Sequence, residues 1–127
     1  MKRCSLILAA GAALAAAPAI AADSTARLAL LSCTTGLDAG QRTAVYEGRM
    51  RRVSGTRRMQ MRFALQWRQP GSARWTQIKA AGLGIWVSSN AGVKTYTFTK
   101  RIENLAAPAS YRVVVRFRWL DASGHSK

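Results

Sequence analysis

The sequence predicts an all-β domain, either a sandwich or a barrel, on three observations. Tyr111–Trp119 alternates, with apolar or aromatic residues at its odd positions and arginine at three of its four even positions. Arg57–Arg68 alternates in the same way. Between Asp23 and Lys127 no segment has helical periodicity, and turn-forming residues separate short apolar stretches. Because strand side chains alternate between two faces, each alternating segment offers one face to a core and one to solvent.

The first 22 residues have the pattern of a signal peptide. Lys2 and Arg3 give a basic start, an uncharged Leu/Ala run follows from residue 6 to 17, and Ala19-Ile-Ala21 provides small residues at a cleavage site. A retained membrane anchor is the alternative, but the run is mostly alanine and ends in the small-residue site. We therefore expect a signal peptide at 1–22, a single domain at 23–127, a secreted or periplasmic location and no membrane span after cleavage.

Two strands are expected before residue 54. Ala26–Cys33 is largely apolar and ends in a turn-rich stretch, and Arg42–Val53 follows it. The residues of Arg42–Val53 that would face inward are Ala44, Tyr46, Gly48 and Met50. Gly48 is expected to weaken this strand or to mark a bulge.

The alternation of Arg57–Arg68 predicts a strand that faces inward with Met59, Met61, Phe63, Leu65 and Trp67. Gln69–Ala73 contains Pro and Gly and predicts a hairpin loop. Arg74–Lys79 is the expected return strand, with Trp75 and Gln77 on one face and Thr76 and Ile78 on the other.

The remaining elements are short. Ile85–Val87 is an apolar run too short to orient, and Thr95–Ile102 is expected as a strand with Tyr96 and Phe98 inward. Glu103–Ala109 predicts a corner that leads into Tyr111–Trp119, and Asp121–Gly124 predicts a turn near the end of the chain.

From Phe63 onward the pattern resembles a fibronectin type III or related immunoglobulin-like domain. Phe63–Arg68, the Pro-Gly turn and Trp75 resemble the central hairpin of that family, and Leu105 with Tyr111 resembles its tyrosine corner. The resemblance implies an antiparallel β-sandwich in which the corner Tyr places its ring in the core and its hydroxyl on nearby backbone.

The chain departs from this family in several places. Arg42–Val53 lacks the Trp that the family often carries, an additional apolar piece surrounds Trp86, and position 113 is Val where immunoglobulin domains have Cys. Only three residues follow Asp121–Gly124, where the resemblance implies a last strand beside Tyr111–Trp119. One hypothesis is that the 127 residues are a truncated form of a longer protein. Tyr111–Trp119 would then be a long open edge that accepts a strand from another protein.

Cleavage after residue 22 removes Cys4 and leaves Cys33 as a single cysteine. Three states are open to Cys33: a buried free thiol, a disulfide to another chain, or a cysteine whose partner has been lost. The absence of Cys at position 113 means that the resemblance gives it no inter-sheet partner.

The chain is strongly basic, with a formal net charge of +15. If the two alternating strands share a sheet, their outward positions form a possible anion-binding face of Arg58, Arg62, Arg68, Arg112, Arg116 and Arg118. Guanidinium groups suit carboxylate, sulfate and phosphate. The alternative is that these are ordinary polar positions of a solvated strand. Export argues against nucleic acid as the partner and favours wall polymers or acidic glycans.

Catalytic, metal and cofactor motifs are not found in the sequence. The single histidine, His125, lies near the end of the chain, and the carboxylates lie mostly in turns. Glu47 lies on a strand and is expected to face solvent or to pair with an arginine across strands. Trp67 and Trp119 are expected in the core, Trp75 is ambiguous, and Trp86 is the candidate exposed aromatic residue.

The sequence therefore predicts an exported, non-catalytic binding or structural module without cofactor or metal. Binding of an anionic polymer through the arginine face is the first alternative. A small hydrolase is the second, and it would require a pocket holding two close carboxylates.

Overall fold

The computed structural model describes residues 2–6, of these the strand alone, and residues 25–127. The strands in chain order are β1 (Lys2–Leu6), β2 (Ala26–Thr34), β3 (Thr43–Arg51), β4 (Arg58–Arg68), β5 (Thr76–Ile78), β6 (Trp86–Ser88), β7 (Thr95–Ile102) and β8 (Ala109–Leu120). One short 3-10 helix, η1 (Ala39–Gln41), lies between β2 and β3. The all-β prediction is confirmed.

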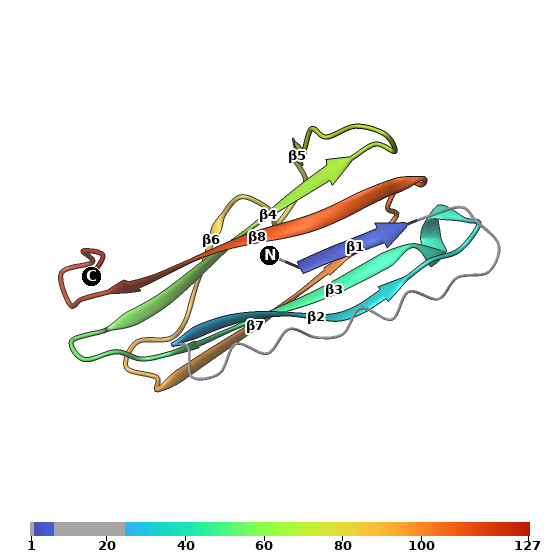
Figure 1. Ribbon diagram of the computed structural model, residues 1–127. Coiled ribbons are helices and arrows are strands. Elements are labelled where there is room, and N and C mark those ends of the chain that lie inside the picture. The colour runs from blue at the N-terminus through green and yellow to red at the C-terminus, as the bar shows by residue number, and fades with distance from the viewer. Residues whose placement is uncertain (1, 7–24) are drawn as a thin grey trace.

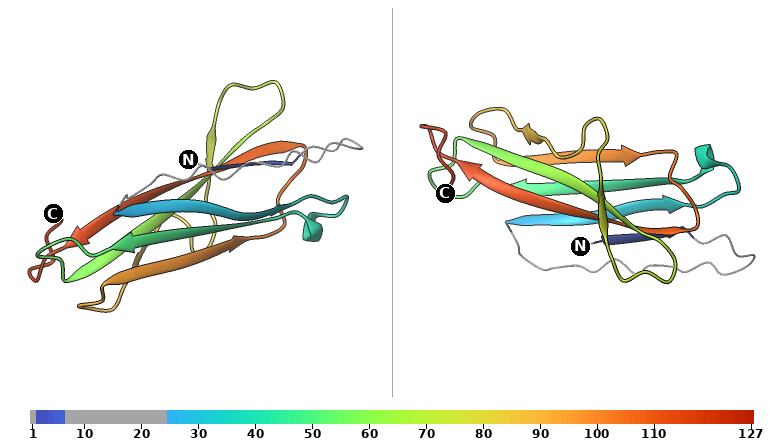
Figure 2. Two further views of the ribbon diagram at one scale, coloured as in Figure 1. Left: turned by 60° about the horizontal axis from the view of Figure 1, so that its bottom comes forward. Right: turned by 90° about the horizontal axis from the view of Figure 1, so that it is seen from above.

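The described strands form two antiparallel sheets that pack face to face as a sandwich (Figures 1 and 2). One sheet has the order β1-β8-β4-β5, and β6 also pairs with β4. The other sheet has the order β2-β3-β7. The long pair β4 and β8 runs through the centre of the first sheet, from Arg58 opposite Leu120 to Arg68 opposite Ser110.

The core lies between the sheets and follows the predicted alternation. In β4 the predicted inward residues from Met59 to Leu65 are buried, and Trp67 packs against them half-buried. Tyr46 and Met50 of β3 are also buried, as predicted. The pairing of apolar faces from both sheets is the main source of stability in such a sandwich, because it removes apolar surface from water.

Gly48 does not mark a bulge, and the pairing of β3 with both of its neighbours is continuous through it. The bulge lies instead in β2, between Leu30 and Ser32. A Cβ at position 48 would lie 2.5 Å from the Met61 sulfur and 3.2 Å from Phe63 Cζ of the facing sheet. Glycine fits there without displacing the β4 side chains, whereas a larger residue would have to move Met61.

The tyrosine corner has the contacts that the resemblance implies. The Tyr111 ring is buried, its hydroxyl donates a hydrogen bond of 2.8 Å to the carbonyl of Ala106, and Leu105 is buried beside it. Arg42 ties the same corner to the loop after β2, because its Nε donates to the Leu105 carbonyl and its Nη1 to the carbonyls of Gly36 and Leu37.

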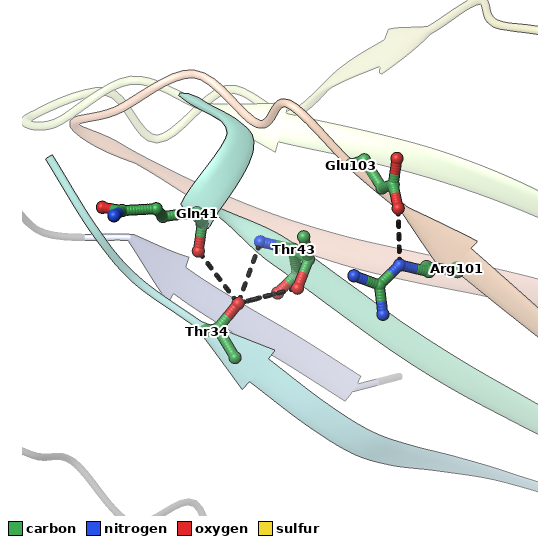
Figure 3. A network of polar contacts seen from close by, with 5 residues as sticks. All are labelled: Thr34, Gln41, Thr43, Arg101 and Glu103. Carbon is green, nitrogen blue, oxygen red and sulfur yellow. Dashed lines mark hydrogen bonds and ion pairs between the residues drawn. The ribbon is translucent and has the colours of Figure 1, made fainter. Parts of the chain in front are cut away.

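The loop between β2 and β3 is closed by a threonine pair (Figure 3). The Thr34 hydroxyl lies 2.7 Å from the Thr43 hydroxyl, donates to the Gln41 carbonyl and accepts from the Thr43 amide. This pair keeps β2 and β3 in register at the end where the loop containing η1 connects them.

The β8 edge is shorter than predicted. β1 pairs antiparallel with Ala109–Val113 of β8, and Lys2 lies opposite Val113. At the other end the chain folds back after the turn at Asp121, with a bridge between Leu120 and Ser126. Among the described residues no strand pairs with 114–118 on this side, so only the middle of β8 is an open edge.

The predicted signal peptide lies for the most part outside the described residues, since its residues 7–22 are not among them. Its residues 2–6 form β1. Among the described residues no helix has the length and apolar character that a membrane span requires.

Cys33 is disulfide-bonded, so the free-thiol state considered for it is wrong.

Candidate anion-binding face

The outer face of the larger sheet carries all six arginines of the predicted set. Met59, Met61 and Phe63 point into the core, so the even-numbered residues of β4 point outward. The register with β8 then places the even-numbered residues of β8 on the same side. The residues so gathered are Arg58, Arg62, Arg68, Arg112, Arg116 and Arg118. Together with Trp75 and Trp86 they are called the Arg–Trp face below.

Trp86 organises one end of this face. It lies on β6 directly opposite Arg62 of β4. The guanidinium carbon of Arg118 lies 3.9 Å from the centre of the Trp86 ring, and that of Arg62 lies 5.0 Å from it. These distances are those of cation–π contacts, each contributing on the order of 0.5–1 kcal/mol at an exposed site.

Gln60 completes this cluster. Its side-chain oxygen accepts a 2.6 Å hydrogen bond from Arg118 Nε, and its amide nitrogen donates to the Ser88 hydroxyl. The row Arg118–Gln60–Ser88 crosses three strands, β8, β4 and β6. A charge-assisted bond on one side and an aromatic ring on the other fix the direction of the Arg118 fork.

The opposite end repeats the arrangement around Trp75. The guanidinium carbons of Arg112 and Arg68 lie 4.3 Å and 4.9 Å from the centre of the Trp75 ring. Arg112 Nε donates a 2.6 Å hydrogen bond to the Gln66 side-chain oxygen. Gln60 and Gln66 are six residues apart on β4, so the two clusters lie roughly 20 Å apart along the strand.

Four arginines of this face lie against aromatic rings, two of these also bond to side-chain amides, and none of the six pairs with a carboxylate of a described residue. The ion pairs among the described residues are Arg49–Glu47, on β3 of the smaller sheet, and Arg101–Glu103, at the end of β7 (Figure 3). The described ion-pair partner of Glu47 is Arg49 on the same strand, and not an arginine of a neighbouring strand as expected. Positive charge on the Arg–Trp face is therefore left without a described counter-ion.

Arg62 of the Trp86 cluster stands directly opposite Arg116. Like charges that face each other across strands are unfavourable unless an anion or acidic group intervenes. Arg116 is exposed and makes no hydrogen bond or ion pair to a described residue. Arg58, by contrast, donates to the Ser89 carbonyl at 3.1 Å, which gives that member of the predicted set a structural contact.

A shallow depression of about 230 Å³ lies beside this opposed pair. Its lining residues are Arg62, Ala64, Gln66, Gln77, Gly84, Val114 and Arg116. We call it the central depression. It lies between the Trp86 cluster and the Trp75 cluster. The pair Ala64–Val114, called its floor below, lies between the pairs Arg62–Arg116 and Gln66–Arg112.

Sequence reasoning grouped the arginines but missed the residues that hold them. Strand alternation places Gln60 and Gln66 on the outward face, but it does not show that they accept hydrogen bonds from Arg118 and Arg112. The position of Trp75 could have been found from sequence, because the alternation of Trp75 and Gln77 with Thr76 and Ile78 places Trp75 on the same face as Gln77. Trp119, expected in the core, is half-buried against it and donates its indole N–H to the Arg51 carbonyl at 2.8 Å.

Among the residues that the structure describes, no group of three or more His, Cys, Asp or Glu side chains is placed to hold a metal ion. Asp121 accepts hydrogen bonds from the backbone amides of His125 and Ser123, and the His125 bond is the main cause that lowers the pKa of its carboxyl group. It serves as the acceptor of a turn.

Comparisons with protein-family models, with curated proteins and with solved structures give no match to this chain.

Proposed function

We propose that this protein is an exported, non-catalytic β-sandwich module that binds anionic polymers, such as acidic glycans or wall polymers, through the Arg–Trp face. The observation that carries the proposal is the opposed pair Arg62–Arg116 on a face where no described carboxylate pairs with an arginine. Repulsion between two guanidinium groups that lie side by side without a described carboxylate is unfavourable to folding. A polyanion supplies the missing counter-charge.

The two clusters support the same conclusion. An arginine whose fork is held by a ring and an amide loses less conformational freedom when it meets an anion than a free side chain does. Arg112 and Arg118 are held in this way at the two ends of the face. The spacing of the clusters suits an extended ligand that runs along the strands.

The finer type of the sandwich and its location belong to the same proposal. The Tyr111–Ala106 contact and the buried Leu105 support an immunoglobulin-like or fibronectin-III-like sandwich. The basic start, the apolar run and the small residues before residue 22 support export. An exported protein meets acidic glycans and wall polymers in preference to nucleic acid.

The test is retention of the full chain on immobilised polygalacturonate in low-salt buffer, with elution by a salt gradient. We expect retention of the wild type, earlier elution as salt rises, and loss of retention in Arg112→Glu/Arg116→Glu/Arg118→Glu. The matched control is Arg27→Glu/Arg49→Glu/Arg51→Glu, which changes the net charge equally on strands of the smaller sheet. Circular dichroism checks that both variants fold. Equal elution of the two variants would show that net charge, and not the face, causes retention.

The single variant Arg116→Glu provides a second test of the proposal, because this side chain has no described hydrogen-bond partner to lose. We expect it to elute clearly earlier than wild type without a change in stability. Unchanged retention of this variant and of the triple variant would refute the proposal.

A further inference from the structure

The central depression has different chemistry at its two ends. Arg62 and Arg116 form one end, and Gln66 and Gln77, which lie opposite each other on β4 and β5, form the other. Ala64 and Val114, also directly opposite each other, form the floor. Successive outward rows on a strand are about 6.6–6.8 Å apart, so cations, floor and amides follow one another within roughly 13 Å.

The cationic end fits one anionic group. Side chains directly opposite each other on antiparallel strands have Cβ atoms about 4.5–5.5 Å apart, so the two guanidinium groups can reach the same carboxylate or sulfate. Arg62 rests against Trp86 while Arg116 is exposed without a described partner, so neither fork is used up by an acidic group.

The amide end offers both donors and acceptors. The Gln66 oxygen already accepts from Arg112 Nε, which leaves its NH₂ group directed to other acceptors. Gln77 is exposed, and its side-chain amide makes no hydrogen bond to a described residue. Hydroxyl groups, which donate and accept, are the natural partners of such a pair of amides.

The floor is small, apolar and flat. Ala64 and Val114 project only methyl groups, and the volume of about 230 Å³ lies below the range of roughly 300–1,000 Å³ typical of clefts for drug-sized ligands. The site therefore has room for one small ring lying against the floor. The C–H face of a sugar ring suits such a surface.

Stacking of nucleic-acid bases is disfavoured on this face. Proteins that bind single strands offer open aromatic rings to successive bases. Here guanidinium groups lie at 3.9 Å and 5.0 Å from the ring centre of Trp86 and at 4.3 Å and 4.9 Å from that of Trp75. Both rings already have cations as their neighbours.

We infer that the central depression is the subsite for one acidic sugar residue of a polysaccharide, a uronate or a sulfated sugar. Its carboxylate or sulfate lies between Arg62 and Arg116, its ring lies on Ala64 and Val114, and its hydroxyl groups bond to Gln66 and Gln77. This inference rests on the proposed function and deepens it, since it names the class of ligand and the orientation of one unit.

The test is calorimetric titration of the full chain with tetragalacturonate, with neutral galactose tetramer and with inorganic polyphosphate, at one low salt concentration. We expect tetragalacturonate to bind best, at least tenfold tighter than the neutral tetramer. Arg62→Gln/Arg116→Gln should lower its affinity at least tenfold. The control Arg27→Gln/Arg51→Gln, on the smaller sheet, should change it less than twofold.

Ala64→Phe separates sugar recognition from charge. It fills the floor and leaves the charge unchanged, so we expect at least a tenfold loss of tetragalacturonate affinity and little change for polyphosphate. Gln77→Ala, at an exposed edge position that bears no core contact, is the second variant should Ala64→Phe fail to fold. We expect it to lower tetragalacturonate affinity several-fold and to leave polyphosphate binding unchanged.

The outcomes distinguish this inference from the proposed function. Absence of any retention on polyanions would refute both. Polyphosphate binding as tight as tetragalacturonate binding, or unchanged tetragalacturonate affinity in Ala64→Phe and Gln77→Ala, would overturn the sugar subsite and leave anion binding by the face in place.

Discussion

The hydroxyl groups of Tyr46 and Tyr111 provide a matched test of what holds this core together. Both rings are almost completely buried, with exposed fractions of 0% and 2%. The Tyr111 hydroxyl donates a 2.8 Å bond to the Ala106 carbonyl, whereas the Tyr46 hydroxyl is buried without a described partner. The same change to Phe at the two positions should therefore have opposite effects on the free energy of unfolding.

The expected magnitudes follow from these contacts. A typical hydrogen bond contributes about 0.5–1.5 kcal/mol net, so Tyr111→Phe should destabilise the protein by about 1 kcal/mol. A buried polar group without a partner costs about 1–3 kcal/mol, so Tyr46→Phe should stabilise it by about 1 kcal/mol. With a urea m-value of about 2 kcal/mol/M, the midpoints should move by roughly 0.5 M in opposite directions.

Urea unfolding of the full chain without reductant, followed by tryptophan fluorescence, measures both changes. The m-values should equal that of wild type, because neither substitution alters the surface exposed on unfolding. A Tyr46→Phe variant that loses as much stability as Tyr111→Phe would refute the reasoning, since its hydroxyl would then have a partner worth keeping.

Three further outcomes are expected. Gly48→Ala should destabilise the protein by about 1–3 kcal/mol through overpacking against Met61, and in a double-mutant cycle Met61→Val should recover part of the loss; two additive effects in urea unfolding would contradict this contact. Burial raises the pKa of Tyr46 and of Tyr111 above the usual 10.0, so the unfolded chain loses these protons first as pH rises. The contribution of these tyrosines to stability should therefore be constant from pH 8 to about 10 and fall above it, by up to about 1.4 kcal/mol per pH unit for each such tyrosine, with a shallower fall in Tyr46→Phe when urea midpoints are measured from pH 8 to 11. Arg42→Met should cost about 2–3 kcal/mol in thermal or urea unfolding because three carbonyls lose a charged donor, and a loss below 0.5 kcal/mol would show that water replaces the guanidinium.

The arginines of the face could be predicted from sequence because the parity of a long alternating strand decides which side chains point outward. The buried odd-numbered residues of Met59–Leu65 and Tyr111–Val113 define the inward face of each strand. The even-numbered arginines of the same strands therefore face outward. The Trp86 cluster could not be predicted in the same way. Trp86 lies on a strand of three residues whose position depends on pairing with the edge of β4, a long-range contact that no local pattern encodes.

The missed role of Gly48 has a similar cause. Local propensity treats glycine in a strand as a weakness, whereas the need for it comes from the Met61 side chain of the facing sheet. Pairing of β1 with β8 was missed because the basic and apolar composition of the first residues indicates a signal peptide and not a sheet strand.

The pairing of Lys2–Leu6 with Ala109–Val113 also sets an order of events during synthesis. The first strand leaves the ribosome long before its partner exists, and about 100 residues at roughly 5–20 residues per second separate the two, a delay of about 5–20 s. During that delay the N-terminal segment has no β8 to pair with. The distance along the chain between these two neighbouring strands thus delays completion of this edge of the sheet until β8 has emerged.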